Sequence, residues 1–170
     1  MIEILKYTLP ALIVLVCSYL LLRSMLKFRL DQLDKEYRSK VSENSLPIRL
    51  QAYERICLML ERISPESLLI RVNRTGMTGL QLQAELMAAI RSEFEHNLSQ
   101  QIYMSDKAWE AVRNARNQVT LLINKTVITN NTQMTSTELS KKILDGLSEY
   151  SKSPVQDALD FIKNEVRQLY

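Results

Sequence analysis

The sequence predicts an all-α protein with an N-terminal membrane anchor, and three observations lead to this prediction. Its 170 residues include only three glycines and four prolines, while helix-forming residues such as Leu, Ala, Glu, Gln, Lys and Arg recur throughout. Residues 7–22 contain no charged side chain. Beyond them, apolar residues recur at spacings of three and four, without strand-like alternation of any length. The length suffices for one compact domain plus an anchor.

The anchor is predicted over residues 1–28. A membrane-spanning helix needs about 20 mostly apolar residues, and apolar neighbours extend the uncharged stretch while Lys6 and Arg23 reach the two interfaces. A cleaved signal peptide would need small residues in an A-x-A arrangement after the apolar stretch. Ser18 and Ser24 instead stand among larger neighbours. We therefore expect a retained anchor rather than a signal peptide or a buried core helix.

The distribution of charge predicts the orientation of this anchor and disfavours a nucleic-acid partner. Arg23, Lys27 and Arg29 follow the apolar stretch closely, and cations near a span prefer the cytoplasmic side. We expect a single-pass protein with its N-terminus outside and its C-terminal domain in the cytoplasm. Residues 1–40 hold seven cations and four anions, so they carry the whole net charge of +3. Residues 41–170 are formally neutral, which is not typical of a nucleic-acid-binding domain.

The remaining chain divides into a stalk and several helical segments. Leu26, Leu30, Leu33 and Tyr37 have helical spacing, so the anchor is expected to continue as a helical stalk over 29–45, ending near residues 42–45. This stripe could pair with a second copy of the chain, although it covers little more than two heptads. Four regions follow the anchor: the stalk at 29–45, a helical bundle at 46–127, a linker at 128–136 and a C-terminal helical pair at 137–170.

Local signals predict where the helices begin. Pro47 stands near the expected start of the first bundle helix, and Ser64 with Pro65 predicts a short helix after it. "NRTGMTGL" is the clearest break in the chain. Capping boxes are predicted at Thr78 with Gln81 and at Thr135 with Glu138, Ser105 is expected to cap a further helix, and Ser153–Pro154 opens the last one. The two long helices joined by "QQIYM" are expected to form an antiparallel hairpin.

Residues suited to catalysis or metal binding are scarce. His96 is the only histidine, and helical spacing separates it from the carboxylates of Glu93 and Glu95. Cys17 and Cys57 stand about forty residues apart, without metal-ligand spacing. The chain also lacks the phosphate-binding, dinucleotide-binding, zinc-protease and serine-hydrolase motifs. We expect no enzyme activity, no metal and no cofactor.

Two groups of apolar residues are candidate partner contacts. Tyr103 and Trp109 belong to the only dense aromatic cluster in the polar half of the chain, and such residues serve as binding anchors where they are exposed. The C-terminal segment carries a narrow stripe that includes Leu159, Ile162 and Val166, which could dock in a partner's groove. The same stripe could instead pack on the protein's own domain. The aromatic pair could likewise fill the hairpin's core.

The segments "LPIRLQAYERICLMLERISPESLLIRV" and "GLQLQAELMAAIRSEFEHNLSQQIYMSDKAWEAV" resemble an uncharacterised family of small single-span membrane proteins of Bacteroidota. The resemblance runs from the anchor to about Ile123, and the tail beyond Val127 is expected to be lineage-specific. It implies placement in a bacterial inner membrane and carries over no functional residue. The function expected from the sequence is a non-enzymatic, membrane-anchored interaction or accessory subunit of an inner-membrane protein complex. The alternative is a structural membrane protein that self-associates through the stalk.

Overall fold

The computed structural model describes the backbone of residues 2–129 and 134–169. It describes their side chains apart from those of residues 2–11, 13, 14, 38, 39, 41–44 and 129. These residues form an all-α protein, as the composition predicts. The helices are α1 (Ile2–Arg62), α2 (Pro65–Val72), α3 (Gly79–Asn97), the 3-10 helix η1 (Leu98–Tyr103), α4 (Asp106–Thr129), α5 (Ser136–Ser148) and α6 (Pro154–Arg167). The chain separates into two compact units, Met1–Ser45 and Leu46–Tyr170.

Helix α1 runs through the point where the sequence predicts a break. The expected helix end near residues 42–45 is wrong, because α1 continues as one helix from Ile2 to Arg62. Pro47 therefore lies inside a helix rather than at its start. A proline removes one backbone hydrogen bond, but the φ angle that it imposes is compatible with a helix. No glycine lies between residues 1 and 62 to offer the chain a better stopping point.

The first unit contains the predicted anchor and stalk. Within the described part of the chain, no helix combines the length and the apolar character needed to cross a bilayer. The predicted anchor depends largely on residues 2–11, 13 and 14, whose side chains lie outside the described ones. The stalk is helical throughout, and its described side chains are exposed at every position from 29 to 37.

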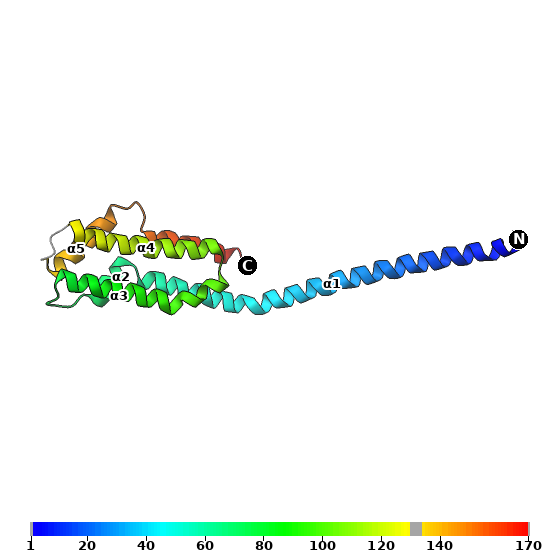
Figure 1. Ribbon diagram of the computed structural model, residues 1–170, viewed down its shortest axis with the longest axis horizontal. Helices are drawn as coiled ribbons and strands as arrows, with labels where there is room; N and C mark the ends of the chain where they lie inside the picture. Colours follow the sequence, from blue (N-terminus) through cyan, green and yellow to red (C-terminus); the bar gives the residue numbers. More distant parts are fainter. Residues whose placement is uncertain (1, 130–133, 170) are drawn as a thin grey trace. The chain divides into compact units, whose positions relative to one another are not determined.

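The second unit is a helical bundle with one hydrophobic core. Helix α3 and helix α4 are joined by η1 and run in opposite directions, which confirms the predicted hairpin (Figure 1). Helix α4 also packs along α6, and α5 packs against α2, α3 and α4. The core is filled by buried side chains from all six α-helices: Tyr53, Ile56, Leu60 and Ile63 of α1, Leu68 of α2, Leu82, Leu86 and Ile90 of α3, Val112, Val119 and Ile123 of α4, Leu139 and Ile143 of α5, and Leu159 and Ile162 of α6.

The beginnings of α3 and α5 are tied together. Both predicted capping boxes form: the side chains of Thr78 and Thr135 accept hydrogen bonds from the backbone N–H of Gln81 and Glu138, and the side chains of Gln81 and Glu138 accept from the backbone N–H of the two threonines. The backbone N–H of Gly79 donates to the carbonyl oxygen of Met134 at 2.8 Å, beside an isolated antiparallel bridge between the two capping threonines. A Cβ atom at residue 79 would stand only 2.9 Å from that same oxygen. Glycine is therefore the residue that allows this close approach of two backbones.

Candidate functional site

Trp109 is part of the bundle core. Its side chain is 9% exposed, and its ring stacks on Phe94 with the ring centres 5.3 Å apart. The guanidinium of Arg116 lies 4.3 Å from the centre of the same Phe94 ring. Trp109 and Arg116 come from α4 and Phe94 comes from α3, so this aromatic cluster joins the two halves of the hairpin. The structure thus places the candidate partner residue Trp109 where it stabilises the fold.

Tyr103 occupies a different environment at the end of η1. It is 36% exposed, and its backbone carbonyl accepts a hydrogen bond of 3.1 Å from Nε of Arg49. Its neighbour Ile102 is 72% exposed, and both Leu98 of η1 and Ile48, which precedes Arg49 on α1, are exposed as well. We call these four apolar residues, Ile48, Leu98, Ile102 and Tyr103, the η1 surface. It lies entirely within the second unit.

The C-terminal stripe faces the protein's own helices. Leu159 is 1% exposed and Ile162 is fully buried, while Val166 is half-buried against the same core. Their helix, α6, packs along α4. This packing removes the reason for predicting these three residues as partner contacts, because their stripe is already covered. A narrow apolar stripe in the sequence indicates a buried helix face, but it does not distinguish between burial by the same chain and burial by a partner.

A polar cluster that the sequence analysis missed surrounds Glu165, near the end of α6. One carboxylate oxygen accepts hydrogen bonds from the hydroxyl of Tyr53 and from the backbone N–H of Ser105 at 3.2 Å. The other accepts one from Oγ of Ser105 at 2.5 Å. That same Oγ accepts a hydrogen bond from the N–H of Ala108 at 3.1 Å, which confirms Ser105 as the predicted cap of α4. The Glu165 cluster therefore links α1, α4 and α6.

The environment of Glu165 favours its ionised form. Partial burial opposes ionisation, but the hydrogen bonds from Ser105 and Tyr53, together with the charge of Arg49, lower the pKa of the carboxyl group overall. Burial and the hydrogen bond to Glu165 raise the pKa of Tyr53 in turn. A serine hydroxyl beside a carboxylate suggests nucleophilic chemistry, yet here the hydroxyl is used for capping and no imidazole contacts it. The cluster is suited to stabilising the packing of these helices.

Replacing Glu165 by Gln is expected to lower the free energy of unfolding at neutral pH by about 1–2 kcal/mol, because hydrogen bonds to a charged acceptor become bonds to a neutral one. The folded-state pKa is lowered, so the stabilisation is present above the ordinary Glu value of 4.5 and is lost as pH falls through the folded-state pKa. Chemical denaturation of both proteins at a series of pH values measures this. The difference should shrink in acid, and Glu61→Gln, at an exposed position of α1, is the matched control.

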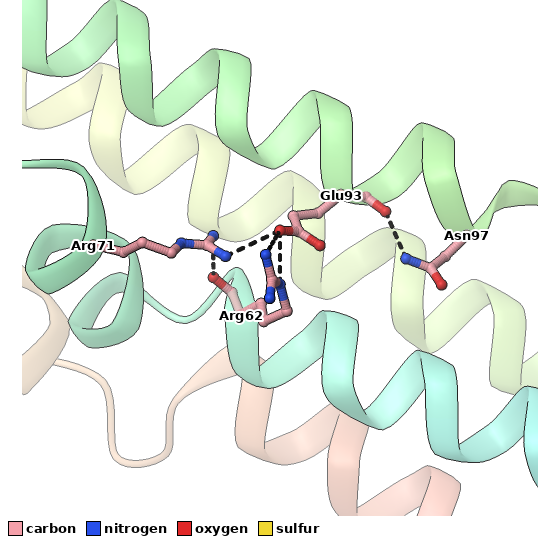
Figure 2. Close-up of polar contacts among 4 residues, drawn as sticks. All are labelled: Arg62, Arg71, Glu93 and Asn97. Carbon is pink, nitrogen blue, oxygen red and sulfur yellow. Dashed lines mark hydrogen bonds and ion pairs between the residues drawn. The ribbon is translucent and has the colours of Figure 1, made fainter.

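A second polar cluster surrounds Glu93 of α3. Nη2 of Arg62 and Nη1 of Arg71 lie 2.6 Å and 3.0 Å from the same oxygen of Glu93, as Figure 2 shows. Arg71 also donates to the carbonyl of Arg62, the last residue of α1, at 3.1 Å. The amide of Asn97 donates to the carbonyl of Glu93. Partial burial opposes ionisation of Glu93, but the two arginines lower its pKa, so it is an ionised carboxylate whose ion pairs join α1, α2 and α3.

His96 and Cys57 are two further described residues whose chemistry could suggest a reactive site. Nε2 of His96 lies 3.4 Å from a guanidinium nitrogen of Arg55 on the protein surface. Cys57 is half-buried, and burial raises the pKa of its thiol, which makes it a weaker nucleophile. Among the side chains that the structure describes, no three His, Cys, Asp or Glu groups come together in a way that could hold a metal ion.

An open groove with a volume of about 480 Å³ lies between α4 and α5. Lys125 of α4 and Lys142 and Asp145 of α5 line it, together with Glu149, which follows the end of α5. Its lining therefore carries two cations and two anions. It opens beside Gly146, where an added Cβ atom would meet the side chain of Leu122 at 3.1 Å. This short distance shows that α5 packs closely on α4 beside the groove.

The fold and its clusters define a small all-α bundle preceded by a long helical segment, with polar ties between its helices. The chain belongs to a family of unknown function, DUF7935, whose match covers residues 1–169. The expectation that the tail beyond Val127 is lineage-specific is therefore wrong, because the family extends through α5 and α6. Comparison with curated proteins and with solved structures finds no match.

Proposed function

We propose that the protein is a non-enzymatic, membrane-anchored accessory subunit that holds a helical bundle beside a membrane-protein partner. The observation that carries this proposal is the η1 surface, where the β-branched side chains of Ile48 and Ile102 are exposed and Tyr103 is partly exposed. Apolar and aromatic residues that remain exposed on a folded domain are typical of interaction sites. The clusters at Glu165 and Glu93 are occupied by structural contacts, which leaves no site suited to catalysis among them.

The membrane part of the proposal is supported by the sequence. Residues 7–22 carry no charge, and Arg23, Lys27 and Arg29 follow them within seven residues. That arrangement favours a single span in a bacterial inner membrane, with the N-terminus outside and the bundle in the cytoplasm. Tethering keeps the bundle at a high effective concentration near its partner, so a modest apolar contact is enough for association.

Fractionation of cells that produce the full chain tests the anchor. We expect the protein to sediment with membranes and to resist extraction by alkaline carbonate. Carbonate releases proteins that are held by electrostatic contacts, but it does not remove an apolar helix from the bilayer. A variant with Leu15 and Leu20 both replaced by Arg is expected to leave the pellet, since each central Arg adds about 2.5–3.5 kcal/mol to the insertion free energy. Complete extraction of the wild-type chain would contradict the anchor.

Two exposed isoleucines test the η1 surface. Ile102→Asp is expected to abolish co-purification of the membrane-protein partner in mild detergent, because a charge at the centre of an apolar contact cannot be desolvated cheaply. Ile70→Asp on α2 is the matched control, since Ile70 is 86% exposed and lies outside this surface. The same proteins recovered in the same ratio from wild type and from both variants would exclude the η1 surface as the docking site.

Self-association is the second candidate function. The observation that favours it is the row of exposed apolar side chains on the stalk, which the bundle's own core does not include.

A further inference from the structure

The stalk exposes more apolar surface than a single helix in water normally does. Leu26, Leu30, Leu33 and Tyr37 are between 60% and 71% exposed, and all four lie on α1 beyond the uncharged stretch 7–22. Charged residues surround them, and Leu30, Leu33 and Tyr37 lie beyond the predicted anchor at residues 1–28, so the bilayer does not cover these three. An exposed apolar stripe of this kind is typical of a surface that contacts another protein.

The spacing of the four residues is that of a two-helix seam. The intervals between them are four, three and four, which places Leu26 and Leu33 at d positions and Leu30 and Tyr37 at a positions of a heptad. The leucines and the tyrosine of residues 26–37 keep to these two positions, while Phe28 is exposed at the outer f position. A helix that packs on a globular domain usually shows a broader apolar face. The shape of the stripe therefore fits one other helix with the same repeat.

The charged residues that flank the stripe are complementary to the same residues on a second copy of the chain. In the same heptad Lys27 and Asp34 occupy e positions, and Arg29 and Glu36 occupy g positions, so the first heptad is flanked by cations and the second by anions. In a parallel pair in register, the g residue of one helix meets the e residue five positions later on the other. Arg29 then meets Asp34 of the second copy, twice per dimer. No second sequence is needed to provide opposite charges.

We propose that the stalk forms a parallel, in-register coiled-coil dimer with a second copy of this chain over residues 26–37. The parallel orientation rests on the proposed membrane anchor, because two anchors in one bilayer with the same orientation send both stalks the same way. An antiparallel pair would satisfy the flanking charges as well, with Lys27 facing Asp34 and Arg29 facing Glu36. The experiment therefore has to separate the two orientations.

Single cysteines in a chain that carries Cys17→Ala and Cys57→Ala report the pairing in native membranes. We expect Leu26→Cys alone and Tyr37→Cys alone each to give a disulfide-linked dimer under mild oxidation, because equivalent positions of a parallel seam face each other. Lys35→Cys, on the outer side of the heptad, is the control and should remain monomeric. In an antiparallel pair residue 26 meets residue 37, so only a mixture of the two variants would cross-link, and that result would overturn the parallel dimer.

Charge exchange gives an independent readout. Arg29→Glu and Asp34→Lys should each weaken self-association, since each variant alone places like charges opposite each other twice per dimer. Coexpressed with different tags, the two variants should form mixed dimers with about a tenfold preference over either self-pair, because both contacts become attractive again. No preference for the mixed pair would count against the Arg29–Asp34 register.

Failure of this inference can be told apart from failure of the anchor. Protein that stays in carbonate-washed membranes but forms no dimer through either cysteine would overturn the stalk dimer and leave the anchor standing. Protein that leaves the membrane fraction yet cross-links through both single cysteines would support the parallel pairing and overturn the anchor.

Discussion

Trp109→Ala is expected to lower the free energy of unfolding by about 3–5 kcal/mol, the usual range for truncating a large buried aromatic side chain. The indole is nearly inaccessible and stacks on Phe94, so its removal leaves a cavity between α3 and α4. Phe94 also loses a partner while it keeps the contact with Arg116. Urea denaturation followed by far-UV circular dichroism measures the change, since the variant lacks the chain's single tryptophan.

Tyr103→Ala is the informative control for this change. The side chain of Tyr103 is partly exposed, and its fold contact with Arg49 is made by the backbone carbonyl, which the substitution retains. We expect a loss below about 1 kcal/mol, as is usual for surface positions. A large loss from Tyr103→Ala, or none from Trp109→Ala, would contradict the placement of one residue on the η1 surface and the other in the core.

The sequence predicts where helices begin in this protein better than it predicts which helices pack against each other. A cap depends on residues three positions apart, and for that reason Thr78 with Gln81, Thr135 with Glu138 and Ser105 can all be recognised in the printed chain. The prediction that a helix starts near Pro47 is wrong, because the chain loses one backbone hydrogen bond there and continues as a helix.

The contacts between distant segments could not be read from local patterns. Glu165 meets Tyr53 and Ser105, residues that are 112 and 60 positions away, and no periodicity connects them. The same is true of Tyr103 and Trp109: they are six residues apart in the sequence, yet Tyr103 is partly exposed at the end of η1 and Trp109 lies in the core. A polar residue on the inner edge of an otherwise apolar stripe, as Glu165 is on α6, is the one signal that could have indicated a buried polar contact.

Ile162→Ala is expected to lower the free energy of unfolding by about 2–5 kcal/mol, because it removes a fully buried side chain from the contact between α6 and the rest of the core. Its neighbour Phe161 is larger but 40% exposed, so Phe161→Ala is the matched control on the same helix. We expect the control to change stability by less than about 1 kcal/mol. Thermal and urea denaturation of both variants compare the two effects directly.

This pair of variants also decides between the two readings of the C-terminal stripe. If α6 belongs to the core, Ile162→Ala weakens the fold and affects any partner only in proportion to the unfolded fraction. If α6 docks on a partner instead, Ile162→Ala leaves the free energy of unfolding unchanged and removes the partner. The bundle predicts the first result, because α4 would otherwise expose the apolar face that α6 now covers. The exposed η1 surface then remains available for a partner while α6 holds the bundle together.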